Sequence, residues 1–336
     1  MPAPVAALGE GRDDGGPLCI DIDSTLVTSH SDDKDGADKT YKRGWGFHPL
    51  LAYLDRGDGT GEALAGRLRP GNAGANDTDD LVEIFDVAWA NLPALPDELE
   101  VVVRTDSAAA SHRFVAHLRR HGVSFSVGFP LSPQVKAAIH AAHAAPDTKW
   151  VPALTQHGDV RDGAHVTELT DRYDLSSWPS GTRLLVRREP FHAGAQQTFD
   201  DIDGYRFTAF ITDQTDPDIA RLEVRHRAHA RVEDRIRCAK DTGLAALPLD
   251  TYDRNQLWVQ LVLVAQELLT FMQRLCLRGE LAIAEPKVLR YKLLHVAARI
   301  TYRSRQTFLK IQRGWPWAKE LVAAFQRLRA LPLPAT

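Results

Sequence analysis

The sequence of 336 residues contains few sulfur-bearing side chains and has no long uninterrupted apolar run. Its three cysteines, Cys19, Cys238 and Cys276, are widely separated, and an odd number cannot all pair. A disulfide framework and a cysteine zinc cluster are therefore not expected. The densest apolar stretch, residues 257–277, is interrupted by glutamine, glutamate and arginine side chains. It predicts a buried helix rather than a membrane span, so no membrane partner is expected.

The first residues also lack the pattern of a secretory signal. Residues 1–16 are acidic and rich in glycine and have no apolar core, so we expect residues 1–17 to be disordered or a linker. The cytoplasm is the default location. At this length the chain exceeds one typical domain, and a core with an inserted or appended unit is expected.

Opposite charges are concentrated in different parts of the chain. The net charge is −3, but residues 1–220 carry 20 basic and 34 acidic side chains, whereas residues 221–336 carry 21 and 10. An acidic part can hold metal ions while a basic part follows a phosphate backbone. We favour contact with DNA for the basic half; a basic, solvated face on ordinary helices is the alternative.

Three acids stand where a metal site needs them. Asp23 ends the alternating apolar run 18–25, and Asp106 ends the β-branched run 101–106; both runs read as strands. Glu233 lies in a predicted helix over residues 228–242, at the rim of an apolar stripe and inside a strongly basic segment. Carboxylate oxygens are preferred ligands of Mg²⁺, and paired ions can assist phosphodiester displacement.

Five motifs in this order resemble the DDE transposases of bacterial insertion sequences, specifically the insertion sequence 1380 family. The last acid of that group lies in a Tyr-x2-Arg-x3-Glu-x6-Lys signature. The matching pieces are Asp23-Ser-Thr25, Tyr41-Lys-Arg-Gly-Trp-Gly-Phe-His-Pro49, Arg69-Pro-Gly-Asn-Ala-Gly74, Arg104-Thr-Asp106-Ser107, and Glu233 with Lys240. The resemblance covers nearly the whole chain, although only about 22 residues precede Asp23, where members usually carry a segment that recognises DNA ends.

The resemblance implies both a fold and an activity. The fold is a ribonuclease-H-like α/β core, with a mixed sheet flanked by helices. In it, Asp23, Asp106 and Glu233 hold two Mg²⁺ or Mn²⁺ ions and act as the catalytic residues that cut and rejoin transposon ends. The partners are double-stranded DNA, as terminal inverted repeats and target, and a second copy of the chain when assembled on DNA. The location is the bacterial cytoplasm, in association with the nucleoid.

Two positions depart from the signature, because His226 and His229 replace its tyrosine and arginine. Basic neighbours can take over their phosphate contacts. The residues predicted to bind DNA are Arg225, Arg227, Arg231, Arg237, Lys240 and Trp178, the last by stacking on an unpaired base. Arg104 and Lys42-Arg43 are further candidates, though a solvated face accounts for them as well.

The coarse order of elements agrees with this fold. Strands are expected over 18–25, 46–55 and 62–68, then a helix over 77–89, a strand over 101–106 and a helix over 108–120 capped by Ser107. The first part of the core spans 18–129, and a β-rich insertion spans 130–216. Residues 217–336 supply the rest of the core and three closing helices, over 252–278, 285–301 and 316–330.

Two other interpretations stay open. Asp21-Ile-Asp23-Ser-Thr25 also fits the motif of haloacid-dehalogenase-type phosphatases, with Asp21 as nucleophile, Asp23 as general acid, and Asp200-Asp201 as a later part of the site. The second alternative is an inactive or domesticated transposase remnant that only binds DNA. An ordinary ion pair between Glu233 and Arg237 is the structural explanation of the third acid.

Overall fold

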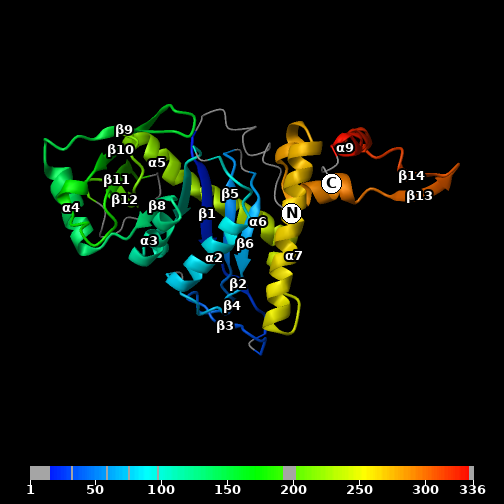
Figure 1. Ribbon diagram of the computed structural model, residues 1–336, viewed down its shortest axis with the longest axis horizontal. Coiled ribbons are helices and arrows are strands. Elements are labelled where there is room, and N and C mark those ends of the chain that lie inside the picture. Colours follow the sequence, from blue (N-terminus) through cyan, green and yellow to red (C-terminus); the bar gives the residue numbers. More distant parts are fainter. Residues whose placement is uncertain are drawn as a thin grey trace.

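A nine-stranded mixed sheet forms the centre of the molecule (Figure 1). The computed structural model describes residues 16–31, 33–57, 60–74, 76–96, 98–191 and 202–332. The strands follow one another across the sheet in the order β6-β5-β1-β7-β8-β12-β11-β10-β9. Most of the predicted N-terminal linker lies outside the described residues.

The first five strands of this order form the predicted ribonuclease-H-like core. They are β6 (Ala63–Arg67), β5 (Leu50–Asp55), β1 (Leu18–Ser24), β7 (Val101–Thr105) and β8 (Ser124–Phe129). β1, β5 and β6 are joined as an antiparallel meander, while β7 and β8 run parallel to β1. This topology confirms the fold expected from the sequence.

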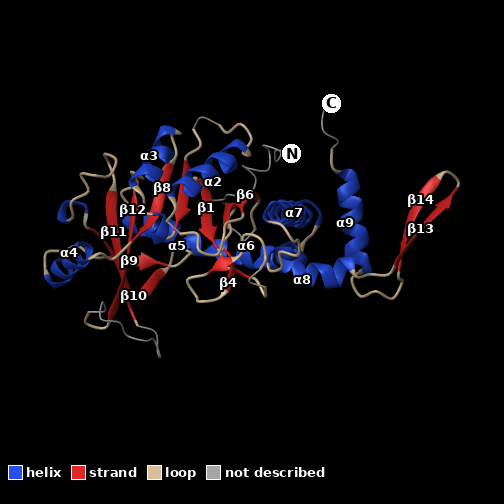
Figure 2. Cartoon of the chain, turned by 90° about the horizontal axis from the view of Figure 1, so that it is seen from below, coloured by secondary structure: helices blue, strands red, loops and turns tan. Residues whose placement is uncertain are grey.

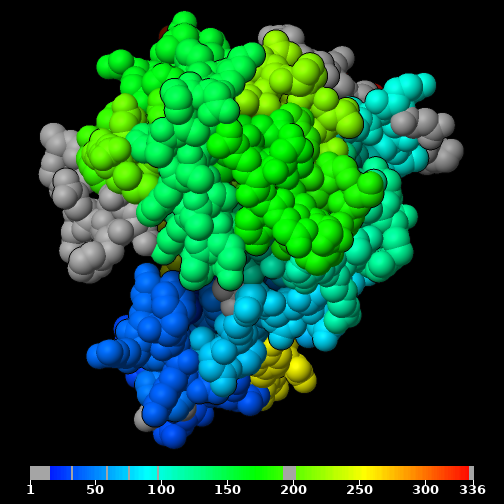
Figure 3. Space-filling view, turned by 90° about the vertical axis from the view of Figure 1, so that its left-hand side faces the viewer, coloured from blue at the N-terminus to red at the C-terminus, as the bar shows by residue number. Residues whose placement is uncertain are grey.

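The other four strands extend the same sheet. They are β12 (Tyr205–Thr212), β11 (Arg183–Pro190), β10 (Val160–Glu168) and β9 (Val151–Leu154). β12 pairs antiparallel with β8, so the predicted β-rich insertion continues the core sheet. Figure 3 looks onto this end of the molecule, with the green residues of α4 (Pro133–Ala144) and these strands above the blue N-terminal segment.

Helices cover both faces of the sheet (Figure 2). On one face α2 (Thr78–Ala90), α3 (His112–Arg120) and α4 pack against the large apolar core. On the other lie α5 (Ile219–Arg227), α6 (Arg231–Ala239) and α7 (Tyr252–Phe271). Strand alternation sets this division: Leu18, Ile20 and Ile22 of β1 face the first group, so Asp21 and Asp23 face the second.

Two predicted boundaries were wrong for local reasons. The helix after β7 begins at His112 rather than Ala108, because the Ser111 side chain caps it, while residues 107–109 form the separate 3-10 helix η1. The predicted strand 46–55 is broken at His48-Pro49. Its first part is β4 (Trp45–Phe47), which joins β2 (Val27–Thr28) and β3 (Asp38–Lys39) in a small sheet beside the core.

The C-terminal region contains helices and a hairpin. α8 (Pro286–Leu289) and the helical turn at residues 290–294 occupy only the first part of the predicted helix 285–301. The chain then forms β13 (Ala298–Arg303) and β14 (Gln306–Ile311), an antiparallel pair that no sequence pattern predicted, and ends in α9 (Ala318–Ala330). Within the described part of the chain, no helix is both long and apolar enough to span a bilayer.

Candidate active site

The three predicted acids lie on three different elements, on the side of the sheet that α5 and α6 cover. Asp23 is near the end of β1, and Asp106 follows β7, the parallel neighbour of β1. Glu233 is in the first turn of α6, where Val232 and Ile236 are buried against β5 and α7. The predicted apolar stripe of this helix is confirmed, and it places Glu233 on the exposed side.

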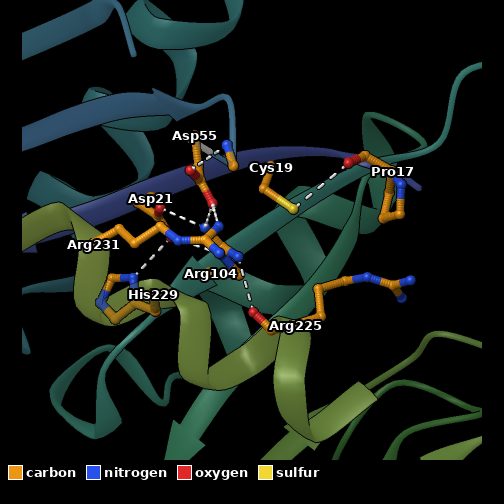
Figure 4. A network of polar contacts seen from close by, with 9 residues as sticks. Pro17, Cys19, Asp21, Asp55, Arg104, Arg225, His229 and Arg231 are labelled. Carbon is orange, nitrogen blue, oxygen red and sulfur yellow. Dashed lines mark hydrogen bonds and ion pairs between the residues drawn. The ribbon is translucent and has the colours of Figure 1, made fainter. Parts of the chain in front are cut away.

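A buried ion cluster is formed by residues that lie near these acids in the sequence (Figure 4). Arg104 and Asp21 are each 1% exposed. Arg104 donates from Nε to Asp21 Oδ1 at 2.8 Å and from Nη2 to Asp21 Oδ2 at 2.6 Å. Its Nη2 also donates to Asp55 Oδ2 at 2.6 Å. This arrangement cross-links β1, β5 and β7, and it corrects the suggestion that Arg104 contacts DNA.

The helical layer completes the same cluster. Arg104 Nη1 donates to the carbonyl oxygen of Arg225 at 2.8 Å. His229 Nδ1 lies 2.9 Å from Asp21 Oδ1, and Arg231 Nη1 donates to Asp55 Oδ2 at 3.0 Å. Asp21 is two residues from Asp23, Arg104 is two residues from Asp106, and Arg231 is two residues from Glu233. The cluster therefore fixes the backbone that carries each predicted acid.

The position of Asp21 is incompatible with a nucleophile. Burial alone would raise its pKa, but the charge of Arg104 and the hydrogen bond and charge of His229 outweigh burial and hold the pKa below its usual value. Both carboxylate oxygens are engaged and enclosed. This excludes the phosphatase interpretation, in which Asp21 attacks the substrate; its other proposed residues, Asp200-Asp201, lie outside the described residues.

Asp23, in contrast, lies close to the other two predicted acids. Burial raises its pKa to about 6; His229 opposes this rise, while the negative charges of Asp106 and Glu233 add to it. Asp23 accepts a hydrogen bond from Ser24 N at 2.7 Å, and Asp106 accepts one from Ala108 N at 3.0 Å. Among the described residues, the carboxylate of Glu233 has no hydrogen-bond or ion-pair partner. The three carboxylates do not lie within 4.8 Å of one another.

Cations border this acidic group. Lys240, the last residue of the signature, is half-buried; burial and the charge of Lys42 lower its pKa, and the nearby Asp23 raises it. His48 belongs to the second motif, and the charge of Asp106 reaches it. Its Nδ1 lies 3.0 Å from the carbonyl oxygen of Ala73, and buried Arg69 donates from Nε to the carbonyl oxygen of His48 at 2.9 Å. These motifs therefore converge on the same region as the acids.

The two histidines that depart from the signature both have specific contacts. His229 supports Asp21, as described above. His226 stacks on Phe210 with ring centroids 4.3 Å apart and an interplanar angle of 4°, and its Nδ1 lies 3.0 Å from Ser126 Oγ. Burial lowers the pKa of His226 to about 3. A neutral aromatic ring and a hydrogen-bonding group thus occupy the place of the tyrosine.

Most side chains predicted to bind DNA already have partners within the protein. Arg227 pairs with buried Glu223 at 3.1 Å, and Arg231 with Asp55. Arg237 pairs with Asp234 at 3.0 Å and with Glu285, so it is not the partner of Glu233. Trp178 packs against His112, with ring centroids 3.9 Å apart and an interplanar angle of 34°. DNA contact stays a prediction for these residues and for Arg225 and Lys240.

The donor set suits a hard divalent cation. Three carboxylates on separate elements supply only oxygen ligands, which Mg²⁺ and Mn²⁺ accept. Burial is the main cause of the raised pKa of Asp23, and repulsion from Asp106 and Glu233 adds to it; a bound cation would relieve both.

A different group of ligand-type side chains lies close together on helices α2 and α3. Asp86 of α2 lies with His117 and His121, at the end of α3, within 4.8 Å. His117 Nε2 is 2.6 Å from Asp86 Oδ1, and Arg120 Nη2 is 2.9 Å from His117 Nδ1. Hydrogen bonds of His117 and ring contacts of His121 account for this cluster, which lies on the opposite face of the sheet.

Three comparisons with known proteins gave different results. Curated proteins give no match. One solved structure with partial likeness is a piggyBac transposase in a synaptic complex with hairpin DNA; it is 8% identical, with a TM-score of 0.43. The likeness covers 76% of this chain and 47% of that one, so the chain spans about half the length of that transposase. The family model described as "Transposase DDE domain group 1" matches residues 12–333. The chain therefore belongs to the DDE transposase domain family.

Proposed function

We propose that the chain is the catalytic part of a DNA transposase that cleaves transposon ends and joins them to target DNA. The observation that supports this proposal is that Asp23 lies near both Asp106 and Glu233, whose negative charges add to the rise in its pKa that burial causes. We also propose that the chain belongs to the insertion sequence 1380 family of bacteria, acts on inverted repeats, and works as a dimer on DNA.

Each part of the site has a distinct task in this proposal. Asp23, Asp106 and Glu233 would hold the metal ions, which when bound supply activation of the attacking oxygen and stabilisation of the leaving oxygen. Lys240, which has Lys42 nearby, places positive charge beside Asp23, where a DNA phosphate would otherwise meet uncompensated carboxylates. The buried cluster around Arg104 keeps the three backbones in place, so little reorganisation is needed when DNA binds.

Removal of the Glu233 charge tests the metal site. We expect Glu233→Gln to abolish Mg²⁺- or Mn²⁺-dependent nicking of a plasmid that carries the inverted repeats flanking the gene, because an amide keeps the shape but not the cation-binding charge. Titration calorimetry should show weaker Mn²⁺ binding, with duplex affinity nearly unchanged.

Asp234→Asn is the matched control. Asp234 is the neighbour on the same turn of α6, is also exposed, and pairs with Arg237. This variant should nick DNA and bind Mn²⁺ like the parent. Equal activity of Glu233→Gln and the parent would show that Glu233 is structural. Duplex binding without nicking by the parent would favour the remnant interpretation.

A further inference from the structure

The β13–β14 hairpin, here called the arm, projects away from the rest of the protein (Figures 1 and 2). Its two strands form a separate two-stranded sheet, and every one of their residues is exposed or only partly buried. Isolated two-stranded hairpins are marginally stable in water. An arm of this kind, about 20 Å long for six residues per strand, therefore needs either a firm base or a partner.

The base of the arm is firmly held. Gln312 N donates to the carbonyl oxygen of Ala297 at 2.9 Å and closes the hairpin at its root. Beyond it, the rings of Tyr291, Trp315 and Trp317 pack edge to face with centroids 5.7–6.0 Å apart. Trp315 Nε1 also donates to the carbonyl oxygen of Lys292 at 2.7 Å. The aromatic cluster therefore fixes the direction in which the arm extends.

The strand register gives the arm one basic face. Residues directly opposite each other point to the same side, and Arg299 lies opposite Lys310 while Arg303 lies opposite Gln306. No acidic residue occurs between Ala298 and Ile311. Among the described residues, no salt bridge involves Arg299, Arg303 or Lys310. Like charges directly opposite each other destabilise a hairpin, so this face favours an anionic partner.

The tip adds another cation at a conformational cost. Ser304 and Arg305 form the two-residue turn, and both have positive φ, 50° and 62°. Such turns favour asparagine and glycine, because other residues are strained there. Arg305 thus keeps a positive charge at the most outlying point of the arm, where a glycine would fold more easily.

We propose that the arm binds duplex DNA, with Arg299, Arg303, Arg305 and Lys310 on the backbone phosphates. The proposal rests on the proposed function in DNA transposition and adds a contact surface outside the acidic site. A two-stranded ribbon is narrow enough to enter the major groove of DNA. The DNA phosphates would supply the negative charge that the opposed cations of the arm lack within the protein. The contacts are to phosphates, so the arm contributes affinity without reading sequence.

The variant R299Q/K310Q tests the arm. We expect it to bind a scrambled-sequence duplex more weakly than the parent in fluorescence anisotropy. The slope of log affinity against log salt should fall by about 2, because each phosphate that a side chain neutralises contributes roughly 0.9 to the slope. Binding to a repeat-bearing duplex should weaken by the same factor. Without DNA, the variant should be at least as stable as the parent, because a repulsive pair has been removed.

The double variant K149Q/R206Q is the matched control. Lys149 and Arg206 are exposed, and among the described residues neither takes part in a salt bridge. Lys149 lies two residues before β9 and Arg206 lies on β12, at the opposite end of the molecule from the arm (Figure 1). This variant should keep the parent's salt slope.

Three results would overturn the proposal. Equal salt slopes for the parent and R299Q/K310Q would show that the arm does not bind DNA. The proposed transposase function would not be affected by that result. Failure of the parent to bind any duplex would overturn both the DNA-binding role of the arm and the proposed transposase function. The apolar face of the arm, formed by Ile300, Tyr302 and Leu309, suits a second copy of the chain. Loss of a dimer in sedimentation velocity with unchanged duplex affinity would assign the arm to self-association.

Discussion

Arg104 holds two carboxylates that are otherwise enclosed, so its removal should be costly. We expect Arg104→Leu to lower the free energy of unfolding by about 3–5 kcal/mol, because Asp21 and Asp55 would stay buried without their main cation. Urea unfolding followed by tryptophan fluorescence measures the loss.

An exposed pair provides the control for Arg104. Arg113 pairs with Asp79 on the surface, with 62% and 77% of their side chains exposed. Arg113→Leu should cost less than about 1 kcal/mol. Similar losses in the two variants would mean that the buried cluster contributes no more than a surface ion pair.

His226 gives the fold a defined pH dependence. Its pKa is lowered by burial to about 3 in the folded protein, against about 6.5 when unfolded. Between these values the unfolded chain binds a proton that the folded chain does not, so stability falls as the pH is lowered. From pH 7 to pH 5, the parent should lose up to about 2 kcal/mol more than His226→Phe. Parallel pH profiles for the two proteins would contradict the assignment.

At the scale of elements, β8 supports the loop that carries Asp106. A Cβ atom on Gly128 would lie 2.6 Å from Ser107 N and 2.9 Å from the carbonyl carbon of Asp106. Both atoms belong to the backbone, so the loop would have to shift. Gly128→Ala should therefore reduce nicking at least tenfold, although no acid is changed, and should cost about 1–3 kcal/mol of stability.

Gly314→Ala is the control for this packing effect. A Cβ atom at Gly314 would have no neighbour within 4 Å. The variant should keep the activity and stability of the parent. Full nicking activity in Gly128→Ala would show that the position of Asp106 tolerates the displacement.

Some elements could be predicted from sequence because their apolar patterns indicate which side chains are buried. β1 has an alternating apolar run and β7 a continuous β-branched run, and both strands were found with the aspartates at or just after their ends. The arm was missed because both of its faces are exposed and its turn contains no glycine, so neither periodicity nor turn chemistry marks it.

The candidate site, too, could be predicted only in part from the sequence. The three acids could be chosen because they match family motifs at strand ends and in a helix. The role of Arg104 could not be predicted, because the sequence does not show whether an arginine on a strand faces DNA or two buried aspartates. Asp55 carries no motif at all; only the pairing of β5 with β1 brings it to the cluster.

At the scale of the whole molecule, the acidic and basic parts of the chain form different structural elements. The acidic part of the chain forms the sheet that presents Asp23 and Asp106, and the basic part supplies α6 and the arm. Net charge hides this separation, since a value of −3 alone argues against a DNA-binding protein. Local fields decide which surface a polyanion approaches.

The buried cluster has a consequence for the order in which the protein can be completed during synthesis. Arg104 faces two aspartates with a single positive charge, and the balancing groups, His229 and Arg231, follow Asp21 and Asp55 by 208 and 176 residues. The strands thus leave the ribosome long before the helix that covers and neutralises them. The same helix brings the third acid. Under the proposed function, a partly made chain that ends before α6 therefore lacks one of the three proposed metal-binding acids, so nicking of DNA must await synthesis of at least residues 1–239.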